Sequence, residues 1–335
     1  MSVLAVSAPN IALIKYWGNR NNEWRLPVAD SLSMTLDGPR LEAEIEASDE
    51  FSILSFDANT SPKPQSDAAI MRLKKHWDLT RQYLETIDKT AGLPENVKIV
   101  IRSAIPPAIG IASSAAVFSA LAEGYAALLK PKAALTREEI SVIARLGSGS
   151  AARSIFGGYA GLFNTGGEGI DSARGKQVAT EHHWLLHDII IVPSQEEKKV
   201  GSTEGHALAA TSPLFEERIK QIPRRMKECT DAILAKDFEK LQHISEEDSL
   251  DMHRVMETQI PSLKYLSSET HRIIREIEVL RKEEHLEVLY TMDAGPTVHL
   301  FCTEDSRKTV EAFAESQKNC IIFKAKTGSG SRIVI

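Results

Sequence analysis

Hydrophobic and polar positions recur along this chain with two different periods, which predict a mixture of strands and helices. Val97, Ile99 and Ile101 alternate with other side chains, as in a half-buried strand. Residues 115–129 carry apolar side chains at helical spacing. The same patterns predict further strands at 3–7, 11–17, 32–36, 41–47, 159–164, 189–192, 286–291, 298–302, 320–323 and 332–335, and further helices at 65–88, 136–146, 214–235, 238–255, 269–283 and 306–317.

Strands and helices mixed in this order are typical of the α+β class. With 335 residues the chain is long enough for two domains, each with its own core. The pattern changes near residue 182, after which a buried strand is followed by largely helical sequence. We therefore predict one domain at 1–182 and a second at 183–335. Pro223 falls inside one predicted helix, so we expect an interruption or a bend there.

A loop of small residues separates the strand at 97–102 from the helix at 115–129. Residues 106–114 have the sequence PPAIGIASS. A loop of this kind at the start of a helix presents free backbone N–H groups and the positive end of the helix dipole, which suits a phosphate. Ser113 and Ser114 are able to cap the helix or donate to phosphate oxygens. The alternative is an ordinary loop before a buried helix. Neither a Walker P-loop nor a G-x-G-x-x-G pattern occurs.

Composition and charge narrow the class of protein. The net charge of −6 disfavours a nucleic-acid or anionic membrane surface, so any phosphate site must gather its cations locally. The three cysteines are far apart and form no C-x-x-C pair, which is typical of a reducing compartment. The first ten residues have no secretory signal pattern, so we expect a cytoplasmic protein.

Several polar residues have chemistry of interest, each with an ordinary alternative. Lys15 lies at the end of a predicted strand, where a lysine side chain is usually solvated. Arg153 follows a Gly-Ser-rich turn that it is able to cap, and Asp293 precedes Ala-Gly-Pro as a turn former. These positions lie far apart in the sequence, so their spacing gives no reason to place them in one site. On the helix at 238–255, Asp248, Asp251 and His253 are expected at the surface rather than at a metal site, and no metal-ligating residue is predicted.

Taken together, four stretches resemble the mevalonate diphosphate decarboxylase family of the GHMP kinase superfamily. They are APNIALIKYWG at 8–18, GIASSAA at 110–116, the turn at 147–158 and DAGP at 293–296, and STEG at 202–205 also resembles a family segment. The resemblance implies a two-domain GHMP-kinase-like fold, with an N-terminal domain like ribosomal protein S5 and a ferredoxin-like C-terminal domain. It places the active site between them.

The resemblance also implies a reaction. ATP phosphorylates the tertiary 3-hydroxyl of mevalonate 5-diphosphate, and phosphate and CO₂ then leave to give isopentenyl diphosphate, a step of isoprenoid biosynthesis by the mevalonate pathway. ATP and Mg²⁺ are the implied cofactors. The implied partners are phosphorylated mevalonate and a second copy of the chain, with no nucleic acid and no membrane.

By the same resemblance Asp293 orients the 3-hydroxyl, Lys15 lowers the pKa of its partner or steadies phosphate charge, and Arg153 binds the substrate carboxylate. The implied binding residues fall into two groups. They are Tyr16, Ser148, Ser150 and Ser202 for the substrate, and Gly110, Ala112, Ser113 and Ser114 for ATP.

The chain departs from the family pattern near the expected diphosphate. Asn19 stands where the family has a lysine that helps to hold the diphosphate, so a positive charge is missing and Arg20 is a candidate replacement. Ala29 and Asp30 replace an Asn-Ser pair, and Thr297 follows DAGP where asparagine is frequent. Three alternatives stay open: decarboxylation of mevalonate 5-phosphate, a GHMP small-molecule kinase without decarboxylation, and a non-catalytic protein that binds a phosphorylated metabolite.

Overall fold

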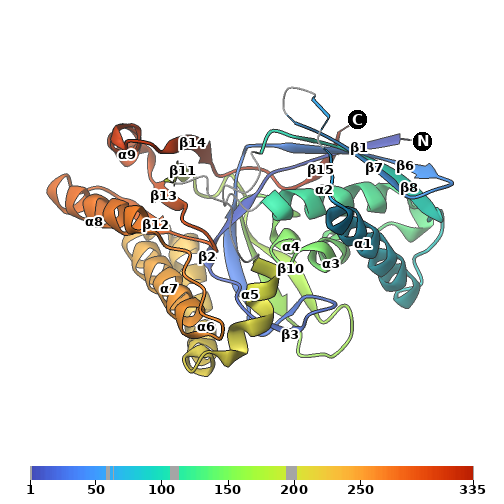
Figure 1. The fold of residues 1–335 in the computed structure, drawn as a ribbon, viewed down its shortest axis with the longest axis horizontal. Coiled ribbons are helices and arrows are strands. Elements are labelled where there is room, and N and C mark those ends of the chain that lie inside the picture. The colour runs from blue at the N-terminus through green and yellow to red at the C-terminus, as the bar shows by residue number, and fades with distance from the viewer. Residues whose placement is uncertain (1, 58–60, 63, 106–112, 194–201, 335) are drawn as a thin grey trace.

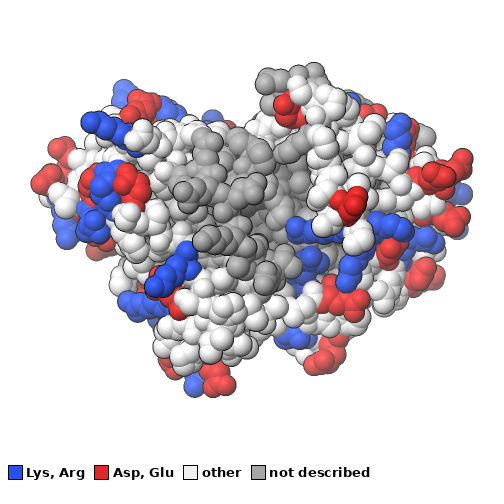
Figure 2. Space-filling model, viewed as in Figure 1, with Lys and Arg blue, Asp and Glu red and all other residues white. Residues whose placement is uncertain are grey.

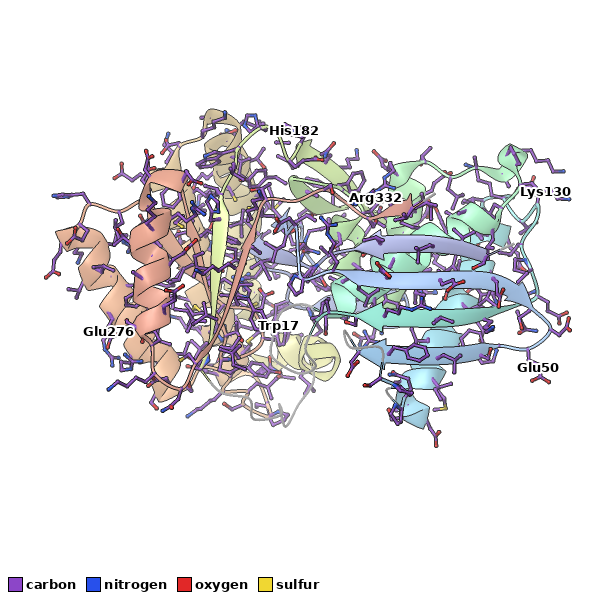
Figure 3. The ribbon with its side chains drawn as sticks, turned by 90° about the horizontal axis from the view of Figure 1, so that it is seen from above. Trp17, Glu50, Lys130, His182, Glu276 and Arg332 are labelled. Carbon is purple, nitrogen blue, oxygen red and sulfur yellow. The ribbon has the colours of Figure 1, made fainter. Side chains whose placement is uncertain are left out.

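The structure is a computed structural model, and it describes residues 2–57, 61–62, 64–105, 113–193 and 202–334. Figure 1 shows a β-rich first half, which holds both chain ends, and a second half of helices packed on a sheet. In the view from above, Trp17 lies near the meeting of the two halves, while Glu50 and Lys130 lie at the far end of the first (Figure 3). This architecture confirms the α+β class.

The first half is built on a five-stranded sheet in the order β15-β1-β6-β8-β7. Only β7 and β8 run parallel. The predicted alternation is confirmed, because Val97, Ile99 and Ile101 are all buried against helices. The strands are β1 (Ser2–Ser7), β6 (Leu41–Ser48), β7 (Ser52–Asp57), β8 (Asn96–Ser103) and β15 (Arg332–Val334), and the helices are α1 (Asp67–Thr86), α2 (Ser113–Leu128), the 3₁₀ turn η1 (Pro131–Ala133) and α3 (Arg137–Gly147).

A second sheet, in the order β10-β9-β5-β2, joins the two halves. Ile11, Met34 and Tyr159 from this sheet share a core with Leu289 and Phe301 of the second half. The sheet therefore carries apolar residues of the first half onto the second. Its strands are β2 (Asn10–Ile14), β5 (Ser31–Thr35), β9 (Tyr159–Asn164) and β10 (Ala173–Ala179), accompanied by the short pair β3 (Asn19–Asn21) and β4 (Leu26–Pro27) and by helix α4 (Ala151–Ser154).

The second half has an antiparallel sheet in the order β12-β13-β11-β14. Ile273, Ile277 and Val310 from two helices fill the core on one face of this sheet. The strands are β11 (His187–Val192), β12 (Val288–Thr291), β13 (Val298–Cys302) and β14 (Ile321–Lys326), and the helices are α5 (Ser202–Leu208), η2 (Ala209–Thr211), α6 (Phe215–Ala235), α7 (Phe238–Thr258), α8 (Ser268–Glu283) and α9 (Glu304–Ser316).

Some predictions differ from the structure. Of the interruption or bend expected at Pro223, the interruption is wrong, because α6 continues through that residue. The strands β3, β4, β7 and β10 were not predicted; β7 lies at a sheet edge and is only partly buried, so its side chains alternate weakly. The last strand, β15, returns to the first half, where Val334 pairs with Leu4. No described helix is long and apolar enough to cross a membrane.

Candidate active site

The central contact of the candidate site joins Lys15 and Asp293. Lys15 directly follows β2, and Asp293 lies just beyond β12. The two elements meet at the interface of the halves, where Thr291 Oγ1 lies 3.5 Å from the Ala12 carbonyl oxygen. Lys15 Nζ donates to Asp293 Oδ1 over 2.6 Å, and the lysine side chain is 1% exposed against 28% for the carboxylate. The buried Lys15 ammonium is thus paired with an Asp293 carboxylate that is still partly exposed to solvent.

The electrostatics of this pair favour an ionised Asp293. Burial by itself raises the pKa of Asp293, but Lys15, with smaller contributions from His299 and Arg153, outweighs burial and lowers that pKa below its usual value. Burial lowers the pKa of Lys15, while the Asp293 carboxylate works in the opposite direction. Asp293 is therefore a carboxylate at neutral pH, able to accept a hydrogen bond from a substrate hydroxyl.

The backbone of Lys15 is fixed by a buried ionic network. Asp248 Oδ2 accepts the Lys15 backbone N–H at 2.6 Å, and the same carboxylate binds Arg218 and Arg225 of α6 at 3.0 Å each. The expectation of a surface position for Asp248 and His253 is wrong, since the two are 0% and 3% exposed. A buried carboxylate needs charged partners. These come from a neighbouring helix, which the spacing along α7 does not reveal.

Arg153 lies in α4 and is fully enclosed. Its Nε donates to Asn10 Oδ1 at 3.2 Å and its Nη1 to Ser31 Oγ at 2.6 Å. Burial lowers its pKa to about 10, and the Asp293 carboxylate works against that shift. No carboxylate oxygen of the described residues lies within 4.0 Å of this guanidinium. Neutral ligands therefore orient a cation whose charge stays available to an anionic ligand.

Tyr16 lies between the turn at 148–150 and α5. Its hydroxyl donates to Asn19 Oδ1, and its ring packs against His206 with centroids 4.2 Å apart and the ring planes tilted by 33°. Gly149 leaves room for the ring, because a Cβ there would lie 2.3 Å from Tyr16 Cε1. His206 Nδ1 accepts the Gly18 N–H at 3.0 Å, and burial lowers the pKa of this histidine to about 3. Sequence analysis missed His206, which carries no motif of its own.

The predicted serines join α2 to the turn at 148–150. Ser114 Oγ lies 3.1 Å from Ser148 Oγ, which lies 3.3 Å from Ser150 Oγ. Ser113 begins α2 and is exposed. Gly110 and Ala112 fall outside the described residues, and Ser202 is described only as the first residue of α5. The N–H groups in the first turn of α2 have no acceptor within the helix, and together with two hydroxyls they form a donor set that suits the phosphates of a nucleotide.

The departures from the family pattern have definite positions. Arg20 Nη2 donates to Asn164 Oδ1 at 3.0 Å, so this guanidinium is engaged on β9. Asp30 Oδ1 accepts the Asn164 N–H at 2.8 Å, and burial raises the pKa of Asp30. Asn19 contacts Tyr16 and Asn22. The candidate replacement Arg20 is therefore bound to Asn164 rather than to Tyr16.

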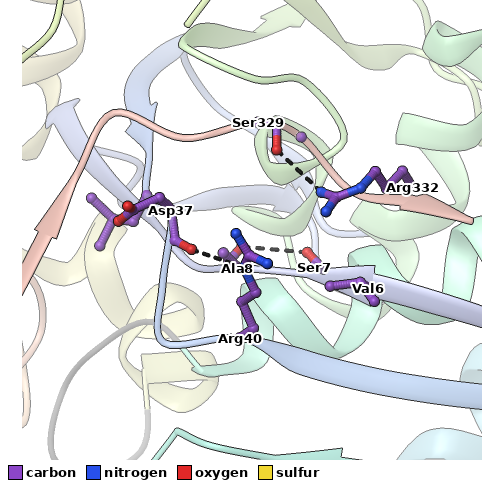
Figure 4. Close-up of a pocket in the computed structure, with 9 residues that line it drawn as sticks. Val6, Ser7, Ala8, Asp37, Arg40, Ser329 and Arg332 are labelled. Atoms are coloured by element: carbon purple, nitrogen blue, oxygen red, sulfur yellow. Dashed lines mark hydrogen bonds between the residues drawn. The ribbon is translucent and has the colours of Figure 1, made fainter. Parts of the chain in front are cut away.

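A separate pocket is lined by other residues than those of this site (Figure 4). It forms where the segment 329–332 passes β1, and Asp37 and Arg40 close its side. Arg40 Nε donates to the Asp37 carbonyl at 3.1 Å. None of the predicted site residues lines it, so we do not assign the reaction there.

Comparisons with known proteins agree with this geometry. Residues 7–173 match the model of the diphosphomevalonate decarboxylase-like N-terminal domain, and residues 188–328 match that of the mevalonate 5-diphosphate decarboxylase C-terminal domain. The fold is that of the two-domain GHMP-kinase-like enzymes. The chain belongs to the diphosphomevalonate decarboxylase family.

Individual relatives cover nearly the whole chain. The diphosphomevalonate decarboxylase of Candida albicans is 35% identical over 318 residues, which cover 91% of this chain and 86% of that protein. The crystal structure of mevalonate diphosphate decarboxylase from Staphylococcus aureus has a TM-score of 0.87 at 26% identity and covers 100% of this chain and 98% of that one. A structure described as MDDEF in complex with MVAPP, AMPPCP and magnesium has a TM-score of 0.84 at 28% identity and covers 100% and 99%.

Proposed function

We propose that this chain phosphorylates the 3-hydroxyl of mevalonate 5-diphosphate with ATP and decarboxylates it to isopentenyl diphosphate, ADP, phosphate and CO₂. The observation that carries the proposal is the Lys15–Asp293 ion pair, with Arg153 close enough to act electrostatically on Asp293, in a chain of this family. These three groups match the needs of a substrate with a tertiary hydroxyl and a carboxylate.

Each residue has a distinct task in the reaction. Asp293 accepts the hydrogen bond of the 3-hydroxyl and aligns its oxygen for attack on the transferred phosphorus, taking the proton as the new P–O bond forms. Lys15 keeps Asp293 ionised and stabilises negative charge on the phosphoryl oxygens. The C3–O bond then breaks with its electron pair leaving on phosphate. The C1–C2 electrons form the C2=C3 double bond as CO₂ departs.

Arg153 fixes the geometry of bond cleavage. A guanidinium is a fork of N–H donors that matches a carboxylate, and Asn10 and Ser31 already hold this one in place. Binding the substrate carboxylate there orients the C1–C2 bond relative to the leaving phosphate. We assign Tyr16, Ser148, Ser150 and Ser202 to the 5-diphosphate.

The nucleotide site is proposed at the start of α2. ATP supplies the transferred phosphoryl group, and Mg²⁺ neutralises part of the phosphate charge. Ser113 and Ser114 would hold phosphate oxygens together with backbone N–H groups of α2, and we extend this assignment to Gly110 and Ala112. No group of three or more metal-ligating side chains occurs in the described part of the chain. Mg²⁺ usually binds substrate phosphates, so we propose phosphate oxygens as its principal ligands.

One observation favours a second candidate substrate, mevalonate 5-phosphate. Asn19 carries no charge, and Arg20 is engaged by Asn164, so neither residue of this turn offers Tyr16 a free cation. We further propose a cytoplasmic homodimer, which light scattering after size-exclusion chromatography would test.

The deciding experiment follows CO₂ from carboxyl-labelled mevalonate 5-diphosphate and mevalonate 5-phosphate, each with ATP and Mg²⁺, while ADP is measured in parallel. We expect CO₂ to equal ADP, with the 5-diphosphate as the better substrate. A better 5-phosphate would move the assignment to the second candidate. ADP without CO₂ would make the protein a kinase, and neither product would indicate a metabolite-binding protein.

A further inference from the structure

Helix α7 places polar side chains along the open edge of the sheet in the second half. Among the described strands of that sheet β12 is outermost and pairs only with β13, so alternate N–H groups of β12 point away from the sheet. α7 packs beside this edge (Figure 1). Figure 2 shows charged side chains on the surface of both halves, whereas Glu246, Ser249 and His253 of α7 are at most 9% exposed. These buried groups therefore need polar partners inside the protein.

Two of these side chains bind the N–H groups of that edge. The Tyr290 N–H donates to Glu246 Oε1 at 3.1 Å, and the Met292 N–H donates to Ser249 Oγ at 3.0 Å. Ser249 Oγ in turn donates to the Met292 carbonyl at 3.2 Å. A hydroxyl is able to accept and donate at the same time. Ser249 therefore fixes both backbone polar groups of the residue directly before Asp293.

His253 holds the same turn through its ring. The ring hydrogen-bonds to the backbone carbonyls of Met292 and Asp293, and Nε2 has no partner among the described residues, so Nδ1–H is the donor. Burial, together with the Lys15 charge, lowers the pKa of His253 to about 4. The ring is therefore neutral at pH 7 and adds no charge to the ion pair. Its contribution is to hold the backbone of Asp293 in place.

The same helix also holds the other partner of the ion pair. Asp248, the residue before Ser249, accepts the Lys15 backbone N–H at 2.6 Å. Consecutive residues of α7 thus bind the backbone at Lys15 and at Met292. Because a helix is a rigid element, neighbouring positions on α7 fix the distance between these two backbone segments. α7 therefore aligns the joining sheet, which carries Lys15, with the loop that carries Asp293.

We propose that Ser249 and His253 are positioning residues for Asp293, and that α7 sets the distance between the Asp293 carboxylate and Lys15. The inference rests on the proposed function, in which Asp293 takes the proton of the 3-hydroxyl. Held in this way, Asp293 Oδ1 lies 2.6 Å from Lys15 Nζ, and its side chain is 28% exposed toward the substrate. A carboxylate displaced by about 1 Å would be poorly aligned with the hydroxyl, which lowers kcat more than it weakens substrate binding.

The kinetic test compares Ser249→Ala with Ser245→Ala as the matched control. Ser245 lies one turn earlier on the same face of α7, is also 0% exposed and has no hydrogen bond to residues 288–293. We expect kcat of Ser249→Ala to fall about 10- to 100-fold, while KM for the mevalonate substrate and for ATP stays within about threefold. Ser245→Ala loses an equally buried hydroxyl and should keep the kcat of wild type.

The pH profile separates positioning from a general loss of stability. Burial raises the pKa of Asp293, and the largest opposing influence is a neighbouring ammonium. The charged and titratable groups around Asp293 are Lys15, His299, Arg153 and His253. A carboxylate released from α7 lies farther from that ammonium, so the acid limb of the residual kcat/KM in Ser249→Ala should move to higher pH. Ser245→Ala should keep the acid limb of wild type.

Two variants of His253 test the ring in the same way. His253→Leu removes the N–H donor while keeping similar bulk, so we expect kcat to fall about 10- to 100-fold. The amide of His253→Asn offers an N–H near the place of Nδ1, and this variant should regain much of the loss. Unchanged kcat in Ser249→Ala and His253→Leu, or an equal loss in Ser245→Ala, would overturn the proposal. If Ser249→Ala failed to fold, the two His253 variants would decide.

A second readout needs no turnover. In crystal structures of the variants, we expect the separation of Lys15 Nζ and Asp293 Oδ1 to lengthen by about 1 Å in Ser249→Ala and to stay at that of wild type in Ser245→Ala. If wild type released CO₂ from neither substrate, the proposed function would fail, while these structures would still decide whether α7 holds the pair. An unchanged separation in Ser249→Ala and His253→Leu would refute the inference.

Discussion

Lys15 and Asp293 are 278 residues apart in sequence, yet their side chains form an ion pair of 2.6 Å. Lys15 is contributed by the sheet that joins the halves, and Asp293 by the loop between two strands of the second half. The contact is therefore made only when the halves are packed together. An enzyme that uses both groups needs that packing for its chemistry as well as for its stability.

Replacing Asp293 tests the role of its carboxylate. In Asp293→Ala the 3-hydroxyl loses its acceptor, so we expect kcat to fall about 10²- to 10⁴-fold, while ATP still binds because α2 is untouched. ADP release and a nucleotide titration measure the two effects. Turnover close to that of wild type would refute the assignment.

Replacing Lys15 should move the acid limb of the pH profile. With Lys15 present the pKa of Asp293 lies below its usual value, so activity is kept until the pH falls to that low pKa. Lys15→Met removes the main stabilising charge and leaves burial, which raises the pKa of Asp293. The acid limb of the residual kcat/KM should therefore shift to higher pH, whereas in Lys15→Arg, which keeps the charge, it should stay near that of wild type. An unchanged acid limb in Lys15→Met would contradict the conclusion that Lys15 lowers the pKa of Asp293.

Gly149 lies so close to Tyr16 that a larger residue at position 149 should disturb the tyrosine ring. In Gly149→Ala the new methyl group would meet the tyrosine ring at 2.3 Å and displace it. We expect a rise of about tenfold in KM for the phosphorylated substrate, with a smaller change in KM for ATP. Gly38→Ala is the control, because nothing lies within 4 Å of its added Cβ. Equal kinetics of both variants would mean that Tyr16 does not touch the substrate.

Buried neutral histidines should make the fold sensitive to acid. Burial lowers the pKa of His76 to about 3, so the unfolded chain binds a proton more readily than the folded chain between that value and about pH 6.5. The free energy of unfolding therefore decreases as the pH falls through this window, by about 1.4 kcal/mol per pH unit. His76→Gln should lessen the loss between pH 7 and pH 5 by about 2 kcal/mol in urea denaturation. The exposed His182→Gln should leave the pH dependence as in wild type; if His76→Gln did the same, His76 would not be the source.

A lysine at position 19 tests whether this turn contacts the 5-substituent. Asn19→Lys places an ammonium beside Tyr16, so we expect a severalfold lower KM for the 5-diphosphate relative to the 5-phosphate. Asn22→Lys adds the same charge at an exposed position of the same turn and should leave the preference unchanged. An unchanged preference in Asn19→Lys would show that position 19 does not read the substituent.

The elements with a strong local pattern could be predicted from the sequence. The alternation in β8, the helical spacing of α2 and the predicted helix at 136–146 all correspond to the structure. Each depends on residues within a few positions of one another, so the sequence contains the whole signal. The motifs around Lys15 and Asp293 also identified the family, although their spacing did not connect them.

The tertiary structure alone decided which side chains meet. Asp248 was expected at the surface of its helix, but Arg218 and Arg225 on α6 compensate its charge and allow its burial. Likewise Ser249 and Met292 come from different elements and meet only where α7 packs beside β12. Periodicity reports whether a position faces inward, but charge compensation depends on groups brought together by packing. The sequence by itself thus determined the elements with a strong local pattern and the family, while the fold determined the electrostatics of the site.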